Sequence, residues 1–86
     1  MRSNEEIFEV VKKHLTETVD TIPAAMVTRE ASMKELGANS LDIVEVVSCS
    51  MRELKVRVPR EALASLKNIG ELVDLLHRVH AEKAAS

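Results

Sequence analysis

Ser40 is the residue with the clearest chemical potential. It lies in the run Gly37-Ala38-Asn39-Ser40-Leu41-Asp42, where a loop gives way to an amphipathic pattern. A serine in the first turn of a helix exposes its hydroxyl beside backbone N–H groups that lack intrahelical partners. The helix dipole also favours negative charge there, so a phosphodiester on this hydroxyl would be well placed. An ordinary helix cap by Asn39 or Ser40 fits the same position, and spacing alone favours that simpler interpretation.

The remaining nucleophiles and metal ligands lack partners at a useful spacing. Cys49 is the only cysteine, which excludes an internal disulfide and a multi-cysteine metal site. His77 and His80 have no evident third ligand, and His14 is expected to be a half-buried, hydrogen-bonded core histidine. The sequence shows no distinctive carboxylate pair, hydrolase elbow or glycine-rich phosphate loop. We therefore predict no catalytic residues and no metal, since an enzyme would need Ser40, Cys49 or His14 to find a distant base.

Composition narrows the class of protein further. The chain has 86 residues, of which 45% are hydrophobic, so we expect one small globular domain covering residues 1–86. A net charge of -2, scattered cations and a single aromatic residue, Phe8, argue against nucleic-acid binding. The polar first residues do not resemble a signal peptide, and no segment has the length of a membrane span. The expected location is the cytoplasm.

Capping signals and hydrophobic periodicity define the expected elements. Ser3 and Glu6 have the spacing of a capping box, and Asn68 and Glu71 repeat it. The predicted helices cover Asn4 to Thr18, Leu41 to Leu54, a short piece from Arg60 to Ala64, and Ile69 to about Glu82. A long loop joins the first two, and residues 33–36 within it are expected to form one helical turn that Gly37 ends. The fold class is all-α, a small four-helix bundle.

Apolar positions predict how these elements pack. Side chains at steps of three and four place one face of the second helix in the core. That predicted face comprises Val44, Val47, Met51 and Leu54. A loop as long as the first connection is expected to be anchored by its own apolar residues. The predicted anchors are Ile22, Met26, Val27, Met33 and Leu36.

The run Leu36-Gly37-Ala38-Asn39-Ser40-Leu41-Asp42 is similar to the Leu-Gly-x-Asp-Ser-Leu-Asp segment of acyl carrier proteins. The order of elements along the whole chain, including a Val-x-Val-Pro passage into the short third helix, resembles the same family. The resemblance implies that a phosphopantetheinyl transferase joins 4'-phosphopantetheine from coenzyme A to Ser40 through a phosphodiester. The thiol of that arm would carry acyl groups as thioesters to partner enzymes, so the chain itself would be a carrier and no enzyme.

The resemblance also assigns Asn39, Leu41, Asp42 and Glu45 to partner contacts at the start of the recognition helix. Asn39 replaces the usual Asp, and where the family has a strongly acidic face the helix continues with Val46, Ser48, Cys49, Met51 and Arg52. Both departures weaken electrostatic docking and favour a dedicated partner through apolar contact.

These departures favour a polyketide-type carrier, and a monomer is expected for so small a bundle with a polar surface. The Ala-Asn-Ser triplet further resembles acetyl-donor carriers that serve hydroxymethylglutaryl-synthase-like enzymes in β-branching cassettes. The expected partners are therefore the transferase and an acyltransferase, a ketosynthase or such a synthase. A fatty-acid-synthesis carrier and an unmodified helical interaction module, with its groove at residues 46–51, remain the alternatives.

Overall fold

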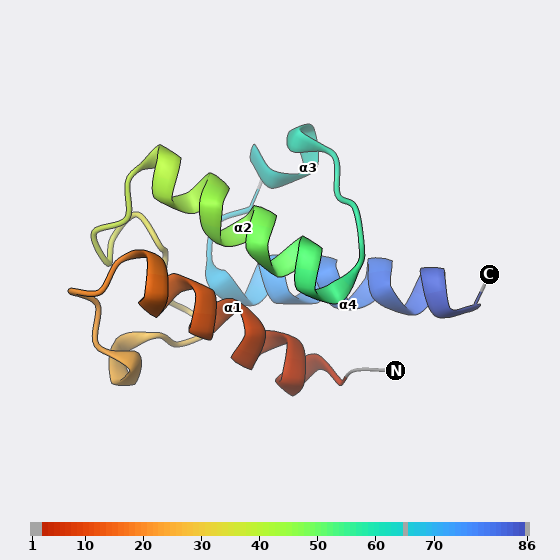
Figure 1. The fold of residues 1–86 in the computed structure, drawn as a ribbon, viewed down its shortest axis with the longest axis horizontal. Coiled ribbons are helices and arrows are strands. Elements are labelled where there is room, and N and C mark those ends of the chain that lie inside the picture. The colour runs from red at the N-terminus through yellow and green to blue at the C-terminus, as the bar shows by residue number, and fades with distance from the viewer. Residues whose placement is uncertain (1–2, 65, 86) are drawn as a thin grey trace.

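The computed structural model describes residues 3–64 and 66–85, and within those ranges it contains helices and loops but no strand. The helices are α1 (Asn4–Thr18), α2 (Ser40–Leu54), α3 (Arg60–Ala64) and α4 (Ile69–Ala85), with a 3-10 turn at Ala24–Met26. α1 packs against both α2 and α4 (Figure 1). The predicted all-α four-helix fold is confirmed. None of the helices in the described ranges combines the length and apolar character that crossing a bilayer requires.

Helix boundaries agree closely with those predicted. α1 and α3 have the expected limits, α2 begins at Ser40 instead of Leu41, and α4 continues past Glu82 to its end at Ala85. The capping box of α1 is present as expected. The Glu6 N–H donates to the Ser3 hydroxyl at 3.2 Å, and the Ser3 N–H donates to the Glu6 carboxylate at 3.1 Å. Local capping chemistry therefore sets where α1 starts.

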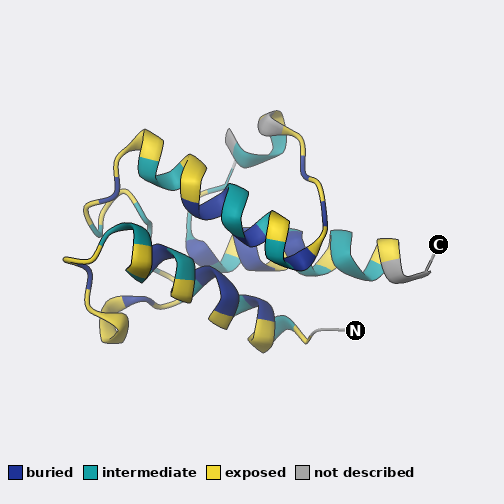
Figure 2. Ribbon diagram, in the orientation of Figure 1, coloured by how far each residue is buried: buried dark blue, intermediate teal, exposed yellow. Residues whose placement is uncertain are grey.

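The core is built from aliphatic side chains of the three long helices. The buried residues lie along the parts of these helices that are coloured dark blue in Figure 2. Such side chains leave water on folding, and truncating one of them to alanine typically costs about 2–5 kcal/mol. The buried residues of the long helices are Ile7, Val10, Val11 and Leu15 in α1, Val46, Val47 and Leu54 in α2, and Ile69, Leu72, Val73 and Leu76 in α4.

The buried face of α2 differs from the predicted one. Val44 is 52% exposed, Met51 is only partly buried, and Val46 and Ser50 are fully buried. The Ser50 hydroxyl donates to the Val46 carbonyl oxygen at 2.8 Å, which satisfies the one polar side chain on this face. A serine in the core shifts the apolar stripe around the helix. The prediction that Val44 faces the core was therefore wrong, and Val46 cannot contribute to an exposed recognition surface or groove.

The long loop between α1 and α2 is held by some of the expected anchors. Ile22 and Val27 are buried, and Met33 and Leu36 pack partly against the core. Met26 was wrongly predicted as an anchor. It is 56% exposed, because the 3-10 turn Ala24–Met26 buries none of its residues.

The same loop is tied to the first turn of α4. The Ile69 N–H donates to the Ala31 carbonyl at 2.9 Å, and the Gly70 N–H donates to the Arg29 carbonyl at 2.8 Å. These bonds satisfy helix N–H groups that would otherwise lack partners. The Arg29 guanidinium also lies 4.9 Å from the centre of the Phe8 ring, which links the loop to α1. The loop thus closes across the N-terminal end of α4.

His14 and Glu53 join α1 to α2 near the end remote from Ser40. His14 Nε2 and Lys13 Nζ each lie 2.8 Å from Glu53 Oε1, so His14 has the half-buried position and the hydrogen-bond partner predicted for it. The hydrogen bonds from Lys13 and then His14 lower the pKa of Glu53 below its ordinary value of 4.5. A carboxylate with a lowered pKa stabilises the fold above that pKa, and this contribution is lost as the pH falls through it.

Replacing Gly70 with alanine tests the loop closure. A Cβ at this position would lie 3.0 Å from the Arg29 carbonyl oxygen and 3.2 Å from the Arg29 Cβ. Alanine usually stabilises a helix interior by about 1 kcal/mol relative to glycine. We expect the opposite sign for Gly70→Ala, a loss of about 1–3 kcal/mol in the free energy of unfolding measured in urea, because the loop must move. A gain of stability would show that the contact is loose.

Replacing Glu53 with glutamine tests the α1–α2 pair. We expect Glu53→Gln to lower the free energy of unfolding near pH 7 by less than about 1 kcal/mol, since the pair is partly exposed. The difference from wild type should shrink as the pH falls below 4.5 and the wild-type carboxylate is protonated. Glu35→Gln, at an exposed loop position, is the matched control and should show no such pH dependence. Urea unfolding across this range measures both, and a difference that persists in acid contradicts the assignment.

Candidate functional site

Asn39 caps α2, and this resolves which of the two candidate residues forms the cap. Its backbone is extended, its side-chain oxygen accepts a hydrogen bond from the Asp42 N–H at 2.8 Å, and the Asp42 carboxylate accepts one from the Asn39 N–H at 3.1 Å. Ser40 is the first residue of the helix and is exposed. Among the described residues, no hydrogen bond engages its hydroxyl. Ser40 is therefore not the cap.

The residues before Asn39 fix the direction from which the chain enters α2. Residues 33–37 form a turn, closed by a 3.0 Å hydrogen bond from the Ala38 N–H to the Met33 carbonyl. Gly37 has a φ of 113°, in the region that glycine adopts without steric cost. Ala38 is then buried, whereas Asn39 and Ser40 are exposed. A buried alanine followed by a capping asparagine thus presents the serine to solvent.

Backbone donors surround the Ser40 hydroxyl. The cap takes up the Asp42 N–H, and the Ile43 N–H donates to the Asn39 carbonyl at 3.0 Å. The N–H groups of Ser40 and Leu41 belong to the first turn and have no intrahelical acceptor. Together with the helix dipole, they create a local environment that favours an anion such as a phosphodiester oxygen. The site can therefore hold a phosphate ester.

The expected partner-contact residues differ in their solvent exposure and in their hydrogen bonds. Leu41 is 80% exposed, and Glu45 is also exposed. Asp42 is half-buried, and its carboxylate is used in the cap, so its role is structural at least in part. Sequence reasoning missed Val44, whose 52% exposure places it beside Leu41 on the outer face of α2. Its position three residues after Leu41 was the available signal.

We call Leu41, Val44 and Glu45 the α2 strip. Large aliphatic side chains that remain exposed next to a candidate modification site are typical of a surface that is covered by another protein. The strip combines two such side chains with one carboxylate, so it offers apolar contact and a single negative charge.

Cys49 is held in a form that disfavours nucleophilic chemistry. Its thiol donates to the Glu45 carboxylate, with Sγ and Oε1 3.3 Å apart. This hydrogen bond, followed by partial burial and the negative charge of Glu45, raises the pKa of Cys49 above its ordinary value of 9.0. Because the thiolate is the reactive species, a thiol kept protonated at neutral pH is a weak nucleophile.

The histidines do not complete a catalytic or metal centre in the described part of the chain. His14 is paired with Glu53, and His77 and His80 are half-buried on α4. Residues 3–64 and 66–85 contain no group of three His, Cys, Asp or Glu side chains placed to hold a metal ion. The site consists of Ser40, the cap behind it and the α2 strip beside it.

Curated relatives match most of the chain. It is 33% identical over 73 residues to the polyketide biosynthesis acyl-carrier-protein AcpK of Bacillus subtilis (strain 168), a match that covers 85% of this chain and 89% of the relative. It is 39% identical over 71 residues to an acyl carrier protein of Saccharopolyspora erythraea, with 81% of this chain and 74% of the relative covered.

A solved structure and a family model agree with these relatives. The chain superposes with a TM-score of 0.80 and 32% identity on one chain of a crystal structure of the curacin biosynthetic pathway HMG synthase in complex with acetyl donor-ACP, covering 90% of this chain and 99% of that one. The family model described as "Phosphopantetheine attachment site" matches residues 9–76. The chain therefore belongs to the acyl carrier proteins, the family of carriers that hold a covalently attached 4'-phosphopantetheine.

Proposed function

We propose that Ser40 is the residue to which 4'-phosphopantetheine is attached, and that the chain carries acyl groups as thioesters on this arm. The observation that carries the proposal is that Asn39 and Ser40, which are neighbours in the chain, have different roles at the start of α2. Asn39 forms the cap, which leaves the exposed Ser40 hydroxyl free of hydrogen bonds to described residues. An exposed hydroxyl at a helix N-terminus suits both the attack on coenzyme A and the charge of the product.

The chain's own part in attachment is to present a hydroxyl and to stabilise an anion. A base of the transferase takes the Ser40 hydroxyl proton, and the Ser40 oxygen forms a bond to the phosphorus that bears the pantetheine. The pyrophosphate bond of coenzyme A breaks, and adenosine 3',5'-bisphosphate leaves. The N–H groups of Ser40 and Leu41 then lie next to the phosphodiester, where negative charge also interacts favourably with the dipole of α2. When bound, the arm supplies a terminal thiol that carries the acyl group as a thioester.

We further propose that the chain serves polyketide synthesis as an acetyl donor. The superposed chain in the HMG synthase complex is almost fully covered by these 86 residues, so it is the acetyl-donor carrier and not the synthase. AcpK is likewise named for polyketide biosynthesis. In this chain, Asn39 and the mainly apolar α2 strip support a dedicated partner that docks through apolar contact. A hydroxymethylglutaryl-synthase-like enzyme fits this description best.

The proposal also covers the other partner enzymes, the location and the oligomeric state of the carrier. An acyltransferase or a ketosynthase would load or use the arm, and the carrier would act as a cytoplasmic monomer without catalysis of its own. The raised pKa of the Cys49 thiol, which disfavours the nucleophilic thiolate, supports a non-catalytic role. The relative from Saccharopolyspora erythraea is named only as an acyl carrier protein, so a carrier for fatty acid synthesis is the second candidate.

Intact-mass spectrometry tests the attachment residue. After incubation with a promiscuous phosphopantetheinyl transferase and coenzyme A, we expect wild type to gain the mass of one phosphopantetheine. Ser40→Ala should gain none, because the attacking oxygen is gone, and Ser48→Ala, on the same helix, should gain it as wild type does. An unmodified wild type, or a modified Ser40→Ala variant, would overturn the proposal in favour of a helical interaction module.

Acetyl consumption tests the choice of partner. The acetyl-loaded carrier should lose acetyl to a hydroxymethylglutaryl synthase from a β-branching cassette when an acceptor carrier bears a β-ketoacyl chain. Leu41→Asn should slow this transfer by about tenfold, which corresponds to the loss of one apolar contact worth about 1.4 kcal/mol. Met26→Asn is the matched control, because Met26 is another exposed apolar residue but lies outside α2.

Two outcomes would contradict this partner assignment. The first is an acetyl group that the synthase leaves untouched while a ketosynthase of fatty acid synthesis consumes it. The second is a Met26→Asn variant that slows transfer as much as Leu41→Asn does. The first result would favour a carrier for fatty acid synthesis. The second would show that the partner docks on a surface other than the α2 strip.

A further inference from the structure

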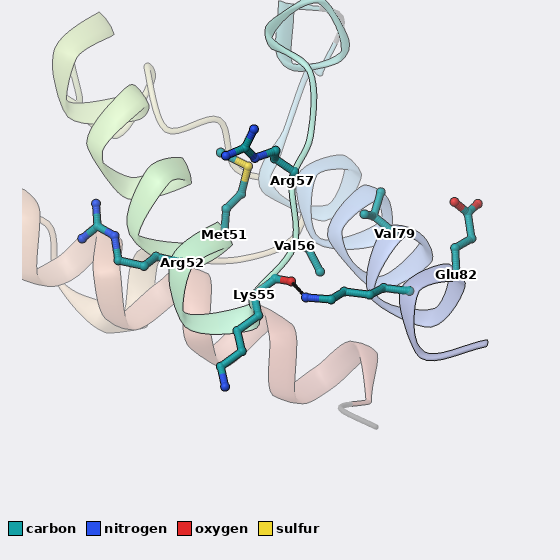
Figure 3. Close-up of a pocket in the computed structure, with 8 residues that line it drawn as sticks. Met51, Arg52, Lys55, Val56, Arg57, Val79 and Glu82 are labelled. Carbon is teal, nitrogen blue, oxygen red and sulfur yellow. Dashed lines mark hydrogen bonds between the residues drawn. The ribbon is translucent and has the colours of Figure 1, made fainter. Parts of the chain in front are cut away.

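A second surface lies at the end of α2 remote from Ser40. An open groove of about 840 Å³ is formed there by the C-terminal ends of α2 and α4 and the segment that follows α2 (Figure 3). Its apolar lining comes from Met51, Val56 and Val79, of which Val56 is buried and the other two are half-buried. The groove therefore offers an apolar floor that water covers only in part.

The rim of this groove is strongly cationic. Arg52, Lys55, Arg57 and Lys83 line it, and Glu82 is the one acidic residue among its lining residues. This concentration of positive charge occurs in a chain whose net charge is -2. Within the described residues, no ion pair neutralises Arg52, Lys55 or Arg57. Arg52 and Lys55 point in different directions from the end of α2, and Glu82 lies across the groove on α4 (Figure 3).

Helix dipoles explain only part of this charge. Arg52 and Lys55 lie at the C-terminal end of α2, where cations are favoured. Arg57 belongs to no helix. It alternates with the buried residues Val56 and Val58, so the extended chain directs it outward over the groove. A cation at this position stabilises neither helix through its dipole, which indicates a role outside the fold itself.

Hydrogen bonds shape the groove before any partner arrives. Lys55 has a φ of 58° and ends α2, with its N–H donating to the Arg52 carbonyl at 3.3 Å. The Lys83 ammonium donates to the Lys55 carbonyl, which joins the ends of α4 and α2 across the groove. A preformed wall of this kind lowers the ordering cost that binding would otherwise carry.

We propose that this basic groove, defined by Met51, Arg52, Lys55, Val56, Arg57, Val79, Glu82 and Lys83, binds an acidic amphipathic helix of a partner protein. Leucine-type side chains of such a helix would cover the apolar floor, and its carboxylates would pair with the cationic rim. Charge complementarity points to an acidic partner, and the apolar floor points to a helix with one hydrophobic face. Nucleic acid fits less well because the groove has no aromatic side chain for stacking, and a membrane surface fits a protruding patch better than a groove.

The distance between the groove and Ser40 suggests what binding of a partner helix in the groove would achieve. The two lie at opposite ends of α2, whose 15 residues correspond to about 20 Å at the usual helical rise. A helix bound in the basic groove would leave the Ser40 end accessible to a catalytic domain. Tethering at one end raises the effective concentration of the arm at the other, without occupying the surface beside the arm.

Fluorescence anisotropy with a synthetic peptide tests the proposal. The probe is a labelled helical peptide of about 15 residues, with leucine on one face and glutamate on the others, and the scrambled sequence is its composition control. We expect the holo carrier to bind the probe at low ionic strength and the double variant Arg52→Glu/Arg57→Glu to bind at least tenfold more weakly. Lys34→Glu/Lys67→Glu makes the same charge change at exposed positions outside the groove and should bind within twofold of wild type.

Amide chemical shifts and competing ligands complete the test. Shift changes on adding the probe should centre on residues 51–57 and 79–83, and circular dichroism should confirm that both double variants are folded. Failure of the probe to bind, equal binding of the scrambled peptide, or equal loss in both double variants would overturn the proposal. Tighter binding to single-stranded DNA or to anionic phospholipid vesicles than to the probe would overturn it in favour of those ligands.

Discussion

The reciprocal hydrogen bonds between Asn39 and Asp42 are the interaction on which the functional surface depends. By taking the capping position, Asn39 leaves Ser40 as the first helical residue with an exposed hydroxyl. The positive φ of Gly37 and the burial of Ala38 bring Asn39 to that position. If the cap lay one residue later, the Ser40 hydroxyl would accept a hydrogen bond from a backbone N–H of the first turn. It would then be less available for modification.

Packing behind the cap decides which side chains accompany the serine. Val46 and Ser50 fix the rotation of α2 about its axis, because the former is fully buried and the latter bonds its carbonyl. Leu41 and Val44 consequently face solvent beside Ser40. The opposite end of α2 has a different chemistry, because the cationic side chains of Arg52, Lys55 and Arg57 line an apolar groove there. One helix thus presents an attachment end with apolar contacts and a basic end suited to a separate acidic partner.

Local signals in the sequence predicted most of the fold. Capping pairs such as Ser3 with Glu6 and Asn68 with Glu71 are short-range, and in the structure the Glu71 N–H donates to Asn68 Oδ1 at 2.9 Å. The errors have tertiary causes. The predicted apolar face of α2 left out Val46 and Ser50, and Ser50 can lie in the core because its hydroxyl is satisfied inside its own helix. The basic groove was not predicted, because its lining comes from residues 51–57 and 79–83, two stretches of the chain that only folding brings together.

The role of Ser40 shows the limit of local reasoning most clearly. Capping physics alone favoured an ordinary cap, and resemblance to acyl carrier proteins indicated modification, while the structure assigns the cap to Asn39. Peptide-level fragmentation mass spectrometry of the wild-type chain, after reaction with a phosphopantetheinyl transferase and coenzyme A, tests this account most directly. The account predicts that the arm maps to Ser40 alone; an arm mapped to Ser32, Ser48 or any other residue would contradict it.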